Sequence, residues 1–190
     1  MAEWMRSNRL RLNPEKTDFL WCATRRQCIH LDTAELSVCG ALIRPSTSVR
    51  DLGVLLESDL SMRHHIAWTV GCCFRQIRLI SSCIKSLPLG AAKTAVAAFV
   101  TSRVDRYNSL LAGAPACLLD GLQSVLNAAA RLICNRRKYD YVTPLLRDGL
   151  HWLPVPFRIE YKLCLLVFLS LHIAAPEYLR DCCIGTHSST

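Results

Sequence analysis

The chain has 190 residues, of which half are hydrophobic and a fifth are charged, with eight Gly and eight Pro. This composition excludes a wholly disordered, collagen-like or low-complexity chain, and the length suits one domain or one small and one medium module. The net charge of +8 is uneven, because residues 1–60 hold eight basic and eight acidic side chains whereas residues 61–190 hold fifteen and seven. A basic part beside a neutral part favours a polyanionic partner such as nucleic acid, although many domains are mildly basic without that role.

The cysteines and the apolar runs bear on where the protein resides. The eleven Cys are odd in number and include the adjacent pairs Cys72–Cys73 and Cys182–Cys183, which suits reduced, packed thiols better than a disulfide framework. The longest apolar run, residues 163–175, is shorter than the roughly 20 residues of a membrane span and predicts a buried helix. The N-terminus has no apolar signal segment. We therefore expect an intracellular protein of the nucleus or cytoplasm, neither secreted nor in a membrane.

The first sixty residues predict the end of a helix followed by a small antiparallel β unit. A weak apolar stripe in residues 3–11 ends at Asn13-Pro14, because the residue before a proline avoids the helical region. Residues 44–48 predict a turn. Patterns typical of strands occupy residues 17–23, 29–36, 36–43 and 49–56.

The remainder predicts a mostly α-helical bundle. Ser61 is a suitable N-cap for the first helix. Helical spacing of apolar residues predicts helices at residues 62–86, 89–112, 116–137 and 157–173. Residues 181–190 are polar and predict a mobile tail. The fold class is therefore α+β: a short N-terminal helix end and a small antiparallel β unit, followed by a mostly α-helical bundle.

Five segments of the chain form a larger pattern: NRLRLNPEKTDFLW, SVRDLGVLLESDLSMRHHI, AFVTSRVDRYNSLLAG, LQSVLNAAARLI and LHWLPVPFRIEYKL. In this order they resemble the C-terminal part of the reverse transcriptases of non-LTR (LINE-type) retrotransposons, and they cover most of residues 4–180. Any one segment alone is weak, but five in the family's order are specific. The resemblance implies three parts. Residues 1–60 would be a C-terminal palm remnant with a primer-grip-like hairpin, residues 61–180 would form a thumb-like and post-thumb helical domain, and residues 181–190 would be a mobile tail.

The resemblance also implies what this sequence lacks. Polymerases of the family copy RNA into DNA with two magnesium ions, which need clustered carboxylates to stabilise the attacking and leaving oxygens. The family supplies these from a palm strand and a Tyr-x-Asp-Asp turn upstream of the Asn-Pro-x-Lys-Thr motif, and this sequence begins after that point and contains no Asp-Asp dipeptide. We expect a fragment of an RNA-directed DNA polymerase that is inactive alone and binds no magnesium.

Three sets of residues carry over from the family by position. Lys16, in Asn13-Pro14-Glu15-Lys16-Thr17, would lie near the leaving pyrophosphate, although without the metal carboxylates it is expected to be an exposed turn lysine. Leu52, Gly53 and Val54 resemble the hairpin that holds the primer end, where a residue without a Cβ lets a sugar-phosphate backbone approach; a bulge glycine is the alternative. The thumb-like part supplies basic candidates for nucleic-acid contacts: Arg75, Arg78, Arg131, Arg136, Arg137 and Lys138.

The strongest local candidate for a nucleic-acid site is residues 131–138 with the two tyrosines that follow. Cations would meet phosphates there, and Tyr139 and Tyr141 could stack on bases; the alternative is a solvated helix end whose cations suit the helix dipole. Zinc sites are not expected, because His64-His65 with Cys72-Cys73, and Cys182-Cys183 with His187, lack the usual spacing. Trp152 is expected to be a packing anchor.

Three functions therefore remain open. The first is an inactive reverse-transcriptase remnant. The second is a basic helical module that binds RNA or an RNA–DNA duplex without sequence preference, with an affinity that falls steeply with salt. The third is a nonfunctional remnant that self-associates through apolar surface left by the missing palm and fingers.

Overall fold

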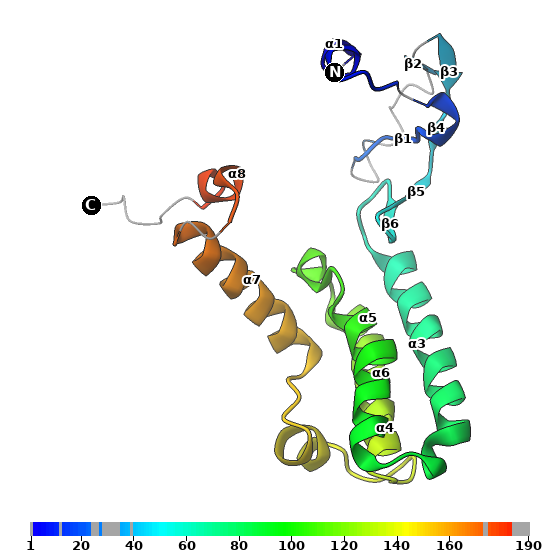
Figure 1. Cartoon of the computed structure of the whole chain (residues 1–190), viewed down its shortest axis with the longest axis vertical. Coiled ribbons are helices and arrows are strands. Elements are labelled where there is room, and N and C mark those ends of the chain that lie inside the picture. The colour runs from blue at the N-terminus through cyan, green and yellow to red at the C-terminus, as the bar shows by residue number, and fades with distance from the viewer. Residues whose placement is uncertain are drawn as a thin grey trace. The chain divides into compact units, whose positions relative to one another are not determined.

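The computed structural model describes residues 2–11, 13–23, 27, 35–38, 40–172 and 175–183 (Figure 1). The chain is a mixed α+β protein, as the sequence predicts, with a short N-terminal helix, two-stranded sheets and a mostly helical C-terminal region. It divides into two compact units, Met1–His65 and Ile66–Thr190. No helix within the described ranges is long and apolar enough to cross a membrane.

Short elements make up the N-terminal unit. They are helix α1 (Ala2–Ser7), the 3-10 turn η1 (Pro14–Lys16), and strands β1 (Phe19–Leu20), β2 (Leu36–Val38), β3 (Ala41–Ile43), β4 (Pro45–Ser46), β5 (Ser48–Asp51) and β6 (Val54–Glu57). The pairs β2–β3 and β5–β6 are antiparallel hairpins, and β1 pairs with β4 in parallel. Most of the strand predicted at residues 29–36 lies outside the described residues.

Two segments predicted as single strands are hairpins instead. Gly40, predicted to continue a strand through residues 36–43, has a φ of 87° and lies in the turn between β2 and β3. Leu52 and Gly53, predicted within one strand at residues 49–56, have φ values of 47° and 92°, and Asp51 pairs with Val54 across them. Backbone in the left-handed region cannot continue a strand, so the chain reverses at both glycines. Gly53 is therefore a turn residue and not a bulge.

Two further expectations for this unit are wrong. The helix predicted over residues 3–11 ends at Ser7, and Arg9 has a φ of 54°, which stops the helical path well before Pro14. The turn predicted at residues 44–48 contains strand β4, whose Pro45 pairs only with β1. A proline lacks the N–H that an interior strand donates, and a two-stranded edge tolerates it.

Helices make up almost all of the C-terminal unit. Helix α3 (Arg63–Cys83) begins at the end of the N-terminal unit. It is followed, in chain order, by η2 (Ile84–Ser86), α4 (Leu89–Val96), the π-helical turn η3 (Ala97–Thr101), α5 (Ser102–Asp105), η4 (Asn108–Leu111), α6 (Ala116–Ile133), the π-helical turn η5 (Leu145–Gly149), α7 (Val155–Leu171) and α8 (Glu177–Asp181).

The helix predicted over residues 89–112 is broken twice. The hydroxyl groups of Thr101 and Ser102 donate to the carbonyl oxygens four residues earlier, at 3.1 and 2.5 Å, a pattern that bends helices and accompanies the π-helical turn η3 here. Tyr107 then adopts a left-handed conformation, with a φ of 58°, and separates α5 from η4. Apolar spacing continues across both breaks, so it could not reveal them.

The core of the C-terminal unit lies between α3, the α4–η3 segment and α6. Helices α6 and α3 come close at Gly121, where a Cβ would lie 3.4 Å from Cγ2 of Val70, at ordinary van der Waals distance. The Cys73 thiol points toward the Val100 carbonyl oxygen, 3.8 Å away. Completely buried side chains include Cys73, Val96, Val100, Val125, Leu126, Ala129 and Ala130. Burial of each Val or Leu contributes about 1.5–3 kcal/mol.

Helix α7 is not the buried helix that residues 163–175 predicted. The exposed fractions of Val167, Phe168 and Leu171 are 46, 56 and 55 %. Along α7 only Val155, Ile159 and Ser170 are buried, because one side of the helix packs on η4, α6 and α8. Residues 173–174 of the predicted run lie outside the described residues.

Candidate nucleic-acid interface

The candidate site begins where α6 ends. Asn135 has a left-handed φ of 50°; its N–H donates to the Leu132 carbonyl at 3.3 Å, and the N–H of Arg136 donates to the Arg131 carbonyl at 2.8 Å. These two bonds form the Schellman motif that ends helices at a left-handed residue. Helix α6 thus ends at Ile133, before the predicted boundary at residue 137, and Arg136 to Lys138 lie in a loop beyond it.

Two residues hold this loop in a defined shape. The Arg131 Nε donates to the Asp140 carbonyl oxygen at 3.1 Å, and the Asp140 carboxylate accepts the N–H of Arg137 at 2.9 Å. The N–H of Asp140 also donates to the Arg137 carbonyl at 3.2 Å. Arg131 is half-buried at the end of α6, and its guanidinium links the helix to Asp140 in the loop.

Residues 136–141, called the basic loop below, present cations and aromatic rings to solvent. Arg136, Arg137 and Lys138 are exposed, and the exposed fractions of Tyr139 and Tyr141 are 89 and 77 %. The Lys138 ammonium lies 5.4 Å from the centre of the Tyr139 ring. This arrangement suits contact with phosphates by the cations and stacking of unpaired bases on the rings.

A second pair of predicted cations lies on helix α3. Arg75 and Arg78 are both exposed and three residues apart, so they share one face of the helix. The basic loop lies at the same end of the helical unit as the α3–α4 connection (Figure 1).

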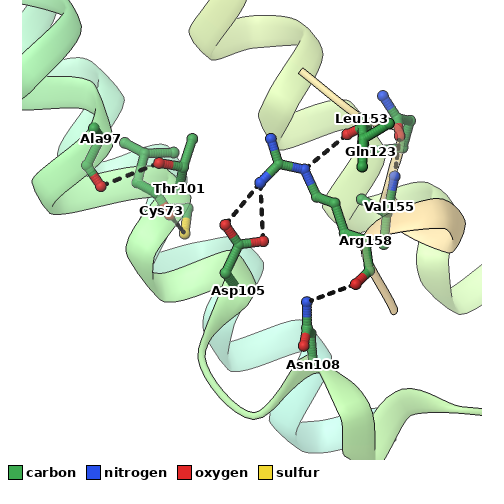
Figure 2. A network of polar contacts seen from close by, with 10 residues as sticks. Cys73, Ala97, Thr101, Asp105, Asn108, Gln123, Leu153, Val155 and Arg158 are labelled. Carbon is green, nitrogen blue, oxygen red and sulfur yellow. Dashed lines mark hydrogen bonds and ion pairs between the residues drawn. The ribbon is translucent and has the colours of Figure 1, made fainter. Parts of the chain in front are cut away.

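A polar network holds the last long helix against the rest of the C-terminal unit (Figure 2). The Arg158 Nη1 donates to both carboxylate oxygens of Asp105, at 2.9 and 2.7 Å, and its Nε donates to the Leu153 carbonyl at 2.7 Å. The N–H of Val155 donates to the Gln123 side chain on α6 at 2.9 Å. The pairing of Asp105 with Arg158 was not predicted, because 53 positions separate them and no local pattern links them.

An apolar cleft of about 640 Å³ lies beside the segment that follows the basic loop. Its walls come from α6, from residues 142–147 and from the start of α7, and they include Leu119, Val142, Leu146, Trp152 and Phe157. Trp152 is half-buried, and the Arg158 guanidinium lies 5.9 Å from its ring.

The candidates in the N-terminal unit lie on turns. Lys16 is exposed in η1, where the Asn13 side chain accepts the N–H of Glu15 at 3.0 Å. In the β5–β6 turn the Leu52 side chain is 76 % exposed and that of Val54 is 5 % exposed. The turn thus exposes the Leu52 side chain and leaves Gly53 half-buried, while Val54 packs inward.

The residues considered as zinc ligands contact other groups or are buried. The Glu57 carboxylate accepts the backbone N–H of His64 at 3.0 Å and contacts the His64 ring. Burial lowers the pKa of His65, whose Nδ1 lies 3.3 Å from the N–H of Leu55, and burial raises the pKa of the Cys73 thiol to about 11. Of the other group, Cys182 and Cys183 follow α8, and His187 lies outside the described residues.

The acidic side chains are the candidate ligands for magnesium ions. Among the described residues, no three His, Cys, Asp or Glu side chains come together as a metal site. The ion pairs found are instead scattered, and join Glu35 to Arg44, Glu57 to His64, Asp105 to Arg158, Asp148 to Arg147 and Glu177 to Arg180.

No family model, no curated protein and no solved structure matches this chain.

Proposed function

We propose that the chain corresponds to the C-terminal part of a non-LTR retrotransposon reverse transcriptase and that its helical unit binds nucleic acid through the basic loop. The ancestry is supported by five segments that resemble the family in order and by the hairpin turn at Leu52 and Gly53, where a primer-holding hairpin is expected. Lys16 and this hairpin would contribute only beside a complete palm.

The observation that carries the binding proposal is the basic loop itself. Three exposed cations and two exposed tyrosines lie within six residues, and the Arg131–Asp140 bond holds that segment in shape. Exposed cations give sequence-independent attraction to phosphates, and a preorganised loop loses less entropy on binding than a flexible one. The expected ligands are RNA and RNA–DNA duplexes.

The test is fluorescence anisotropy with a labelled RNA–DNA hybrid over a series of salt concentrations. Replacement of Arg136, Arg137 and Lys138 by Ala should reduce the slope of log affinity against log salt by about two to three, since each phosphate contact contributes about 0.9. The matched control replaces Lys93, Arg103 and Lys162, which are also exposed, and removes the same charge elsewhere.

The tyrosines give an independent readout. Tyr139→Ala with Tyr141→Ala should weaken binding of single-stranded RNA by about 10- to 100-fold and change hybrid binding much less, because only unpaired bases can stack on the rings. The proposal fails if no binding is found at low salt, or if the loop variant and the control variant lose the same affinity. The first result would leave the nonfunctional remnant as the explanation.

A further inference from the structure

Helix α7 carries a stripe of exposed apolar side chains, called the α7 stripe below. Its members are Phe157, Tyr161, Cys164, Phe168 and Leu171, spaced four, three, four and three residues apart. This alternation places them on one face, as in the seam of a coiled coil. The exposed fractions of the four larger side chains are 56, 61, 56 and 55 % in chain order, and Cys164 is an exposed free thiol.

The α7 stripe is separate from the face by which α7 joins its own unit. The buried face is formed by Val155, Ile159 and Ser170 and is held by the Arg158–Asp105 pair. Leu163 and Val167, 36 and 46 % exposed, border the stripe. The helix therefore has one apolar face packed within the chain and a second that remains open to solvent.

The chemistry of the stripe favours a protein partner. Residues 163–172 contain no Asp, Glu, Lys or Arg, so the part of the stripe from Cys164 to Leu171 offers no cation to phosphates. Earlier in α7, Arg158 is paired with Asp105, and the exposed Glu160 lies one turn from Cys164 and would repel phosphates. A helix that lies on a membrane surface has Lys and Arg along its polar face, whereas Lys162 is the one cation of α7 besides the paired Arg158.

The stripe is complementary to itself in an antiparallel arrangement. Phe157 and Leu171 each lie seven residues from Cys164, so an antiparallel second copy centred on Cys164 places Phe157 of each chain against Leu171 of the other. Tyr161 then meets Val167 and Phe168 of the second copy. A two-fold axis uses the same patch on both chains, which is the commonest form of homodimer.

The exposed area is sufficient for such a dimer. An aromatic side chain can bury about 150–250 Å², so three aromatics that are a little over half exposed, with Leu171, Val167 and Leu163, offer roughly 500–600 Å² on each chain. Two copies together would bury about 1,000–1,200 Å², which reaches the lower limit of roughly 1,000 Å² for a specific interface. We propose that the α7 stripe is the interface of a symmetric antiparallel dimer of this chain.

The first test is analytical ultracentrifugation of the whole chain. The wild type should show a reversible monomer–dimer equilibrium, and Phe168→Glu should weaken it by about 30-fold or more, because a charge would be buried in the interface one turn from its centre. The control is Leu79→Glu on α3, where the side chain is exposed to nearly the same degree, 59 %, and where dimerisation should not change. Circular dichroism of both variants checks that they fold.

The second test uses Cys164, which the two-fold axis brings next to its copy. On mild oxidation with diamide, two Cys164 thiols should lose two protons and two electrons to the reagent, which becomes a hydrazine, and form one interchain disulfide. Peptide mass spectrometry should find the Cys164–Cys164 crosslink well above one between the exposed Cys117 residues. The proposal is overturned if the chain is monomeric, if both Glu variants weaken dimerisation equally, or if Cys117 crosslinks as readily as Cys164.

Two other occupants of the stripe would also overturn the proposal. If residues 1–65 of the same chain cover it, the protein will be monomeric and Cys164 will resist alkylation. If a lipid surface is the true partner, the chain will bind neutral vesicles and Phe168→Glu will abolish that binding without any dimer in solution.

Discussion

Arg158 joins three parts of the C-terminal unit through one side chain. Its guanidinium pairs with Asp105 at the end of α5, donates to the Leu153 carbonyl and lies over Trp152. Its backbone carbonyl also lies 3.5 Å from the Asn108 amide nitrogen. The planar guanidinium can contact Asp105, Leu153 and Trp152 at once, because it carries five N–H donors in fixed directions and a flat face.

Replacement of Arg158 by Lys should therefore destabilise the chain although the charge is kept. The expected loss in free energy of unfolding is about 1–2 kcal/mol, below the value for a fully buried pair because the Asp105 side chain is 41 % exposed. Urea denaturation measures the change, and Arg103→Lys on an exposed part of α5 is the control. Equal stability of the two variants would mean that the network contributes only charge.

At the scale of elements, the β5–β6 hairpin has an unfavourable residue in its turn. Both turn residues have positive φ, which is typical of a type I′ turn, and this turn prefers Asn-Gly where the chain has Leu-Gly. Leu52 therefore holds a conformation that β-carbon crowding disfavours.

Leu52→Asn should raise the stability of the N-terminal unit by about 0.5–1 kcal/mol, since Asn tolerates the left-handed conformation. Hydrogen exchange of the β5 and β6 amides measures the change, with Leu42→Asn, an exposed position of β3 with ordinary strand backbone, as the control. Slower exchange is expected only for the turn variant. Faster exchange in Leu52→Asn would show that the Leu52 side chain makes a stabilising contact.

The junction of β6 with α3 predicts a loss of stability in acid. Burial raises the pKa of Glu57, but hydrogen bonds from the His64 backbone and ring and from Ser61 outweigh it and lower that pKa below its ordinary 4.5. Burial also lowers the pKa of His65 below 6.5. Both groups hold fewer protons folded than unfolded, so their stabilisation is lost as pH falls, first for His65 below about pH 6.5 and then for Glu57 below about pH 4.5.

Hydrogen exchange of β5 and β6 at pH 7 and at pH 5.5, corrected for the intrinsic rates, tests the His65 contribution. Protection should decrease at the lower pH, and His65→Gln should remove most of that decrease, because Gln does not titrate. An unchanged pH dependence in the variant would assign the effect to other groups.

Local patterns in the sequence predicted some elements well and others poorly, for identifiable reasons. Helix α6 was anticipated because its apolar residues keep one period, yet its end was missed although Asn135 is a residue that adopts the left-handed cap. Local patterns missed the turns at Gly40 and Gly53, because the residues around them lack the Asn or Asp that usually marks a two-residue turn; at Leu52-Gly53 only the family resemblance indicated a hairpin. The exposure of α7 was missed because its apolar residues lie on two faces, so periodicity could not say which face packs.

For the chain as a whole, the acidic side chains bear on whether phosphoryl transfer can be expected. The described residues contain no cluster that could hold a pair of magnesium ions, and phosphoryl transfer by two metals requires such a cluster. The contacts proposed for the basic loop, of cations with phosphates and of rings with bases, would not activate a 3′ hydroxyl. We therefore expect binding of a hybrid without DNA synthesis.

The purified chain should not extend a DNA primer on an RNA template, with magnesium or with manganese. A primer-extension assay on a gel measures this, and the same preparation should bind the unextended hybrid, which shows that the protein is folded. Extension that persists through purification and stops in a Lys16→Ala variant would refute the expectation.

The small number of buried apolar side chains in the N-terminal unit has a practical consequence. Among its described residues only Val54 and Met62 are buried hydrophobics, while Trp4, Leu42 and Leu60 are more than half exposed. Such a unit opens at a far lower free-energy cost than the helices, and its two-stranded sheets then present unpaired edges. A protease should consequently digest the chain from this side and leave the helical part as a resistant core, which offers a direct route to crystals or spectra of that part.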